Sequence, residues 1–231
     1  STLISLPLVG LNTVFAPRIS ELHGRGEVEK LKSLYRTLTN WTIAVGLLPF
    51  LIIFLFANPI MGIFGPEFEA SSNILGLLAV GYLMRVASGS AGCILVMTGR
   101  VNLSLANALL GTLLSFLLNL LLIPSLGSTG AAIATTATLA MVSVLGLVEV
   151  FYLLRSQPYG VDSLKPAVSG AIAAVGFLLL FGQGTNLFQI LLLAAGYLGL
   201  SWFLSSSGEK AWIRKIMVAV AEGTTRLLRP E

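Results

Sequence analysis

Charged residues are scarce in this chain: only 10% of its 231 residues are Asp, Glu, Lys or Arg, while 55% are hydrophobic. Soluble domains have about 25% charged residues, so this composition, with a mean hydropathy of +0.90, excludes a soluble globular protein. The longest stretch outside the apolar segments is the tail of residues 205–231, which leaves no room for a soluble catalytic or nucleotide-binding domain. We therefore expect an all-α polytopic membrane protein that is not an enzyme.

Other residues are scarce or missing as well. The single cysteine, Cys93, has no partner in the chain, so it gives no evidence about the redox compartment. No Asp lies within an apolar segment, which weakens the case for proton or sodium coupling, and we expect no metal site and no cofactor. The first residue is Ser1 rather than Met, and we interpret the sequence as a fragment that lacks its N-terminal part.

Seven apolar segments follow one another along the chain. A helix needs about 20 residues to cross a hydrocarbon core of about 30 Å. The segments are residues 1–16, 41–56, 73–98, 101–123, 131–154, 167–181 and 187–204. Pro17 is expected to end the first segment and Pro49 to kink the second. An amphipathic helix over residues 27–38 is expected to lie on the membrane surface before the second segment.

The 14 Lys and Arg residues are distributed asymmetrically. Alternate turns hold five, one, two and five of them, the other three turns hold none, and Arg85 is the remainder. This is the positive-inside pattern, so we expect a multi-pass protein of the cytoplasmic membrane with its basic turns and C-terminus in the cytoplasm. Topology thus accounts for the net charge of +4, and no nucleic-acid partner is expected. The expected parts are membrane helices within 1–154, two additional membrane helices within 155–204, and a basic amphipathic tail over 205–231.

Arg85 lies near the middle of the segment 73–98. A charge at the bilayer centre costs about 2.5–3.5 kcal/mol on insertion scales, and such residues usually face the bundle interior or a water-filled cavity. On a helical projection Gly81, Ser88, Gly89 and Gly92 share the face of Arg85, which would leave room beside the guanidinium. Two interpretations stay open. One is a structural ion pair or carbonyl cap, and the other is an anion site for phosphate, which suits a planar five-donor group.

Two further segments have polar faces. On the segment 101–123 this face consists of Ser104, Asn107, Gly111, Ser115 and Asn119. Such residues commonly hold membrane helices together, and the alternative is a wall of the hydrophilic cavity that Arg85 also faces. On the segment 131–154 the corresponding face includes Thr135, Thr138 and Glu149. Glu149 lies about two turns from the cytoplasmic end, so it is either an interface carboxylate, snorkelling or paired with Arg155, or a coupling carboxylate.

Several motifs, in this order, resemble those of a known family. They are FAPRIS at 15–20, LPF at 48–50, TGR at 98–100 and NLLLIPSLGSTGAAIAT at 119–135. The last resembles the N…IP-x-x-G-x-x-GAA-x-AT signature found at a helix–turn–helix in polysaccharide-type lipid flippases. These flippases belong to the multidrug/oligosaccharidyl-lipid/polysaccharide exporter superfamily. The resemblance covers residue 7 to about residue 154 and depends on the order and spacing of the motifs.

The resemblance implies about fourteen membrane helices in two pseudo-symmetric lobes around a cationic cavity, of which this chain would form the eighth to the fourteenth. It implies a flippase that translocates a polyprenyl-diphosphate-linked oligosaccharide for surface polysaccharide biosynthesis. The partners would be this substrate, membrane lipids and the missing N-terminal lobe of the same chain. Arg85 would hold the diphosphate or an acidic sugar. The other residues of the substrate path would be Ser88, Asn107, Ser115, Asn119 and Thr135. A multidrug antiporter of the same superfamily and a non-transporting membrane subunit are the alternatives.

Overall fold

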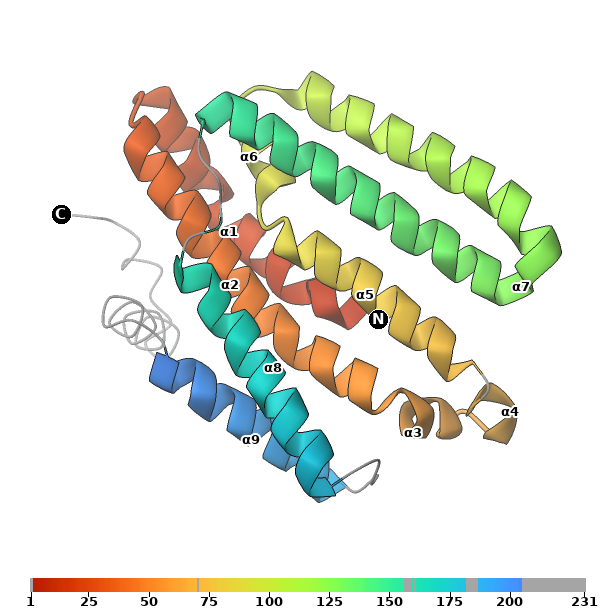
Figure 1. The fold of residues 1–231 in the computed structure, drawn as a ribbon. Coiled ribbons are helices and arrows are strands. Elements are labelled where there is room, and N and C mark those ends of the chain that lie inside the picture. The colour runs from red at the N-terminus through yellow and green to blue at the C-terminus, as the bar shows by residue number, and fades with distance from the viewer. Residues whose placement is uncertain (1, 70, 156–158, 160, 182–186, 205–231) are drawn as a thin grey trace.

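The structure is a computed structural model that describes residues 2–69, 71–155, 159, 161–181 and 187–204. Every regular element in these ranges is a helix (Figure 1). The helices are η1 (Thr2–Ser5), α1 (Leu6–Gly24), α2 (Val28–Leu55), α3 (Ala57–Gly62), α4 (Pro66–Glu69), α5 (Ser72–Ala87), α6 (Ala91–Met97), α7 (Val101–Leu154), α8 (Val161–Phe181) and α9 (Leu187–Leu204). Within the described ranges three helices are long and apolar enough to span a membrane, or four if α5 and α6 cross it together. The predicted all-α polytopic membrane architecture is confirmed.

α7 is two antiparallel arms rather than one rod (Figure 1). A straight helix of its 54 residues would be about 80 Å long at about 1.5 Å per residue, far longer than a bilayer is thick. The chain reverses at Gly127, where φ is 58° and ψ is −133°, a conformation open to glycine. Gly130 then lies so close to the backbone of the first arm that no side chain would fit there. The predicted turn between the segments 101–123 and 131–154 is therefore confirmed.

The expected end of the first segment at Pro17 is wrong. Pro17 lies inside α1, which continues to Gly24. An interior proline removes one helical hydrogen bond and strains the preceding turn. Here Phe15 and Ile19, on either side of Pro17, are both buried in one core cluster, and this packing outweighs the local preference of the proline.

The expected surface helix over residues 27–38 is also wrong, because these residues form the first part of the continuous helix α2. Their apolar residues recur at helical spacing, which predicts a helix face that lies on the membrane surface. In the structure Leu31, Tyr35 and Leu38 are instead buried against α1 and α6. A helical hairpin of α1 and α2 thus covers this face with protein rather than with lipid headgroups.

The segment 73–98 is broken in the middle. α5 ends at Ala87 and α6 begins at Ala91, with an angle of 43° between them. At the break Gly89 has φ 61°, and it packs so tightly on the Thr39 side chain of α2 that no side chain would fit at this position. A positive φ and a close approach both require glycine here.

The buried hydrophobic residues form separate clusters on the two sides of this break. One cluster joins α1, α2, α6 and the end of α7 through Phe15, Ile19, Leu22, Leu31, Tyr35, Leu38, Ala91, Ile94, Leu95, Val150 and Leu154. A second cluster joins η1, α2 and α5 through Ile4, Ile53, Ala79 and Val86. A third joins the end of α2 to α8 and α9, where Phe56 and Phe177 pack with ring centroids 5.3 Å apart. α5 and α6 therefore belong to different clusters although they follow each other directly.

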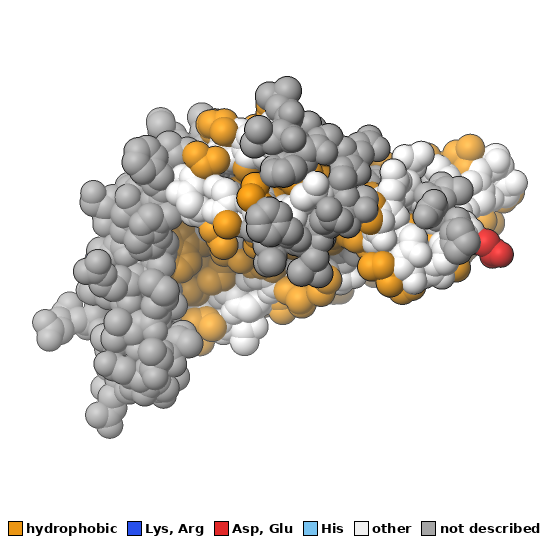
Figure 2. All heavy atoms as spheres, turned by 90° about the horizontal axis from the view of Figure 1, so that it is seen from below, with side chains coloured by type: hydrophobic (Ala, Val, Ile, Leu, Met, Phe, Trp, Pro, Cys, Tyr) orange, Lys and Arg blue, Asp and Glu red, His pale blue; other side chains and the backbone are white. Residues whose placement is uncertain are grey.

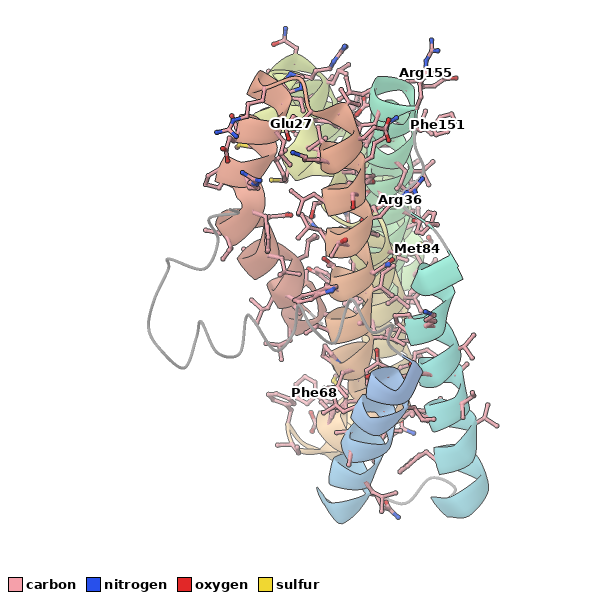
Figure 3. All side chains as sticks on the ribbon, turned by 90° about the vertical axis from the view of Figure 1, so that its left-hand side faces the viewer. Glu27, Arg36, Phe68, Met84, Phe151 and Arg155 are labelled. Carbon is pink, nitrogen blue, oxygen red and sulfur yellow. The ribbon has the colours of Figure 1, made fainter. Side chains whose placement is uncertain are left out.

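Basic side chains gather at one end of the molecule. Figure 3 shows Glu27 and Arg155 at this end, Phe68 at the opposite end, and Met84 between them. Lys30 forms an ion pair with Glu27 at 2.7 Å, and this hydrogen bond holds the pKa of the Glu27 carboxyl below its ordinary value. The face seen in Figure 2 shows an acidic side chain but no basic one among the described residues.

We predict the orientation from this charge separation. In a Cys93→Ser background, Glu67→Cys and Ser128→Cys should react with a membrane-impermeant maleimide in intact cells. His23→Cys, at the basic end, should react only after the membrane is permeabilised. Labelling is measured by mass shift on gels. The topology would be wrong if His23→Cys reacted in intact cells while Glu67→Cys was protected.

Candidate functional site

Arg85 lies in the last turn of α5, one residue after Met84, and both side chains are exposed in this chain. Met84 lies between the two ends of the molecule in Figure 3, and the turn that holds Arg85 lies beside the first half of α2, where the Tyr35 hydroxyl reaches the Ser88 carbonyl. In the described part of the chain the Arg85 guanidinium has no hydrogen bond and no ion pair. Because an unpaired charge in hydrocarbon is costly, this guanidinium must meet either water, a ligand or a group from outside the described residues.

The backbone around Arg85 is held by hydroxyl groups. The Ser88 Oγ donates a hydrogen bond to the Arg85 carbonyl at 2.7 Å, the Tyr159 hydroxyl donates to the Ala87 carbonyl at 3.1 Å, and the Tyr35 hydroxyl donates to the Ser88 carbonyl at 3.4 Å. The carbonyls at the end of a helix have no donor four residues ahead. Three side chains from three parts of the chain therefore replace the missing helical donors at the α5–α6 break.

The predicted open face beside Arg85 is only partly present, because nothing lies within 4 Å of a Cβ added at Gly92 but the other two glycines are packed. Gly81 packs against Thr136 of α7, where an added Cβ would lie 3.0 Å from the Thr136 Cα, and Gly89 packs against Thr39 of α2. The physical reason is the break itself, since a helical projection assumes one continuous helix. These two glycines serve close helix packing and do not make room for the guanidinium. Ser88 is buried, and its hydroxyl is already used as a cap.

The polar face of the first arm of α7 packs on the second arm. Asn107 is buried, and its Nδ2 donates a hydrogen bond to Oε2 of Glu149 at 2.5 Å. Gly111 lies against Val142, with 2.8 Å from an added Cβ to the Val142 Cγ2. Both contacts are those expected of residues that hold membrane helices together. The structure shows Glu149 bonded to an amide of the neighbouring arm, a contact that none of the interpretations of Glu149 included.

Farther along the same arm the polar groups bond within their own helix. The Asn119 Nδ2 donates to the Ser115 carbonyl at 2.7 Å and to its hydroxyl at 3.2 Å. On the second arm Thr135 donates to the Ala131 carbonyl at 2.9 Å. These bonds leave the three side chains half-buried and locally satisfied.

One contact between helices, that of Thr136 with α5, could not be predicted from the sequence. The Thr136 hydroxyl donates to the Leu77 carbonyl of α5 at 3.0 Å, whereas Thr135 and Thr138 bond to carbonyls of their own helix. Thr136 belongs to the same run of polar residues as its neighbours and has no spacing that distinguishes it. Only the packing of α5 on the second arm of α7 identifies it.

The structure does not bring the predicted residues into one site. The second arm of α7 lies between α5 and the first arm (Figure 1), so Arg85 is separated from Asn107, Ser115 and Asn119. A cavity of about 490 Å³ lies elsewhere, between the end of α2, α3 and the start of α5. It is lined by uncharged residues that include Asn58, Ser72 and Asn73. The candidate anion site is therefore Arg85 and the turn of α5 that holds it.

Comparison with known proteins gives one family and one relative. The MatE family matches residues 1–121. The relative is the probable low-salt glycan biosynthesis flippase Agl15 of Haloferax volcanii, which is 29% identical over 135 residues. The match covers 58% of this chain and 28% of the relative. No solved structure matches the chain significantly.

The Asn107–Glu149 bond predicts a difference between two asparagines on one helix face. Asn107→Ala removes the donor of a half-buried carboxylate and should lower the free energy of unfolding by about 1–2 kcal/mol. Asn119→Ala is the matched control, because it removes an amide that bonds only within its own helix, and its effect should be clearly smaller. The measurement is denaturant unfolding of the full-length protein in mixed micelles. Equal losses for both variants would contradict the assignment.

Proposed function

Because the chain belongs to the MatE family of membrane transporters, we propose that it is part of a flippase that translocates a polyprenyl-diphosphate-linked oligosaccharide across the cytoplasmic membrane. The single observation that supports an anionic substrate is Arg85, an exposed guanidinium of a predicted membrane segment without a hydrogen-bond or ion-pair partner among the described residues. The Haloferax relative is named as a probable flippase of glycan biosynthesis. This similarity favours a lipid-linked glycan over a drug as the substrate.

In this proposal Arg85 binds the diphosphate. A guanidinium offers five donors in a planar fork and can bind phosphate oxygens in pairs. In a low-dielectric site each of these bonds is stronger than in water, and the anion removes the cost of an unpaired cation in the span. The remaining walls of the site would come from segments beyond this chain, since the chain spans only 28% of the length of the relative it matches.

The proposal assigns the polar faces of α7 to the scaffold. Asn107, Ser115, Asn119 and Thr135 bond to the other arm or to their own helix, and substrate hydroxyls would have to break these bonds. Glu149 bonds to Asn107 and is proposed to hold the hairpin rather than to couple transport to an ion. We propose that transport is outward, with the basic end of the molecule in the cytoplasm as its charge pattern predicts.

Two alternatives share much of this evidence. A multidrug antiporter would fit the same family match, and for it the charge of Arg85 would be a liability with cationic drugs. A non-transporting subunit would need Arg85 only as half of a structural ion pair. In that case the acidic partner would come from outside the described residues. The effects of substitutions at Arg85 separate these possibilities.

We predict that Arg85→Ala abolishes export of the surface glycan while the protein still inserts in the membrane. The reason is that the variant loses the proposed anion contact but no hydrogen bond or ion pair of the guanidinium within the described chain. Arg85→Lys should recover part of the export, because it keeps the charge and loses the bidentate fork. The measurement is complementation of surface-glycan export in a strain without the full-length protein, normalised to the amount of protein in the membrane.

The amount of folded protein distinguishes a binding role of Arg85 from a structural one. If Arg85 is half of a structural ion pair, both substitutions should lower the amount of folded protein, since removing one partner of a buried pair costs about 3–5 kcal/mol. If Arg85→Ala exports glycan normally at normal abundance, the anion site is wrong. Asn119→Ala, on the scaffold, serves as the matched control and should export glycan normally.

A further inference from the structure

We propose that Tyr35 and Tyr159 are positioning residues for Arg85, and that they act by holding the α5–α6 break in the geometry that presents the guanidinium. This inference rests on the proposed function, because it assumes that Arg85 contacts the substrate. The two tyrosines come from parts of the chain far from each other in sequence, α2 and the segment that follows α7. They meet at consecutive carbonyls of the break, those of Ala87 and Ser88.

The need for such donors follows from the membrane environment. Each backbone carbonyl without a donor in hydrocarbon costs several kcal/mol. At the break the Gly89 amide turns to the Val86 carbonyl and so leaves the Arg85 carbonyl, which takes the Ser88 hydroxyl instead. The Ser88–Arg85 bond joins residues three apart in sequence, so it would persist if the end of α5 changed its orientation. The tyrosine bonds are different, because they fix the break relative to two other elements.

The position of Arg85 makes these bonds relevant to its side chain. Arg85 precedes Ala87 by two residues, so it shares the last turn of α5 with the carbonyls that the tyrosines hold. A rotation of this turn would change the direction of a side chain as long as that of arginine. No described side chain holds the guanidinium directly, so the backbone of this turn sets where the Cα–Cβ bond of Arg85 points and which region the guanidinium can reach. The hydroxyls of Tyr35 and Tyr159 set the path of that backbone.

The two tyrosines differ in exposure. Tyr35 is 1% exposed and Tyr159 is 43% exposed. A donor from outside the described residues can reach the exposed Tyr159 bond and replace its hydroxyl in part, whereas none can reach that of the buried Tyr35. The Tyr35 bond is also the longer one, at 3.4 Å. For this reason the two single changes should have modest effects, and the double variant Tyr35→Phe/Tyr159→Phe is the informative one.

The chain offers a matched control. The Tyr197 hydroxyl of α9 donates to the Ala44 carbonyl of α2 at 2.6 Å, and Tyr197 is also 1% exposed. Tyr197→Phe therefore removes a tyrosine–carbonyl bond of the same kind within the bundle. That bond joins α9 to α2 and involves no group of the α5–α6 break. A general loss of packing should appear in this control, whereas a loss of Arg85 positioning should not.

The experiment uses the full-length protein in vesicles with lipid-linked oligosaccharide as the transported substrate. We expect the double variant to raise the apparent KM about three- to tenfold, the equivalent of a typical hydrogen bond, with unchanged protein amount and a smaller change in kcat. Tyr197→Phe should leave KM unchanged. In an Arg85→Lys background, where the planar fork is absent, the double variant should have a clearly smaller effect on KM.

A second readout does not depend on transport. Met84→Cys, next to Arg85, should change its rate of reaction with a maleimide in the double variant and keep it in Tyr197→Phe. Equal effects of the double variant and Tyr197→Phe on both readouts would overturn the positioning role, as would an undiminished KM effect in the Arg85→Lys background. Normal transport by Arg85→Ala would instead overturn the proposed function. An inactive Arg85→Ala with tyrosine variants that behave like wild type would overturn only this inference.

Discussion

The constraint on which the rest of this structure depends is that backbone polar groups inside a bilayer must find partners within the protein. Two departures from regular helix illustrate this constraint, the α5–α6 break inside the segment 73–98 and the α7 reversal between the segments 101–123 and 131–154, and each has a specific solution. At the α5–α6 break, hydroxyls from three parts of the chain reach the free carbonyls. At the α7 reversal, Gly127 and Pro124 make a turn at the end of the arms, where the chain can leave the hydrocarbon.

The same constraint explains which parts of the fold were predictable. The α7 hairpin was predicted correctly from Pro124, Gly127 and the apolar runs on either side of them, because its turn depends on local residue types. The continuation of α1 through Pro17 was not predicted, since it depends on the burial of Phe15 and Ile19 against other helices. The break of α5 was missed for a similar reason, because Gly89 is required there by the contact with Thr39, and that contact exists only in the folded bundle.

The candidate site shows the same division. Arg85 could be singled out from the sequence alone, because a lone charge in an apolar segment needs no structural context to be noticed. Its surroundings could not. A helical projection grouped Arg85 with Gly81 and Gly89, whereas the structure turns both glycines toward neighbouring helices. Pairwise contacts such as that of Asn107 with Glu149 are also invisible in one sequence, because many registers of two polar-faced helices are compatible with the same spacing.

The contrast between Glu149 and Arg85 separates scaffold from site. Glu149 lies within an apolar segment and has a short bond to a buried amide, so its cost is offset inside the hairpin. Arg85 has a fully satisfied backbone carbonyl but a guanidinium without a partner among the described residues. The described chain supplies three hydroxyls to the carbonyls beside Arg85 and no hydrogen-bond partner to its guanidinium, so it fixes the backbone of this turn and leaves the side chain accessible. If Arg85 binds the anion as proposed, this arrangement is the one expected of a binding group whose backbone is held before the anion arrives.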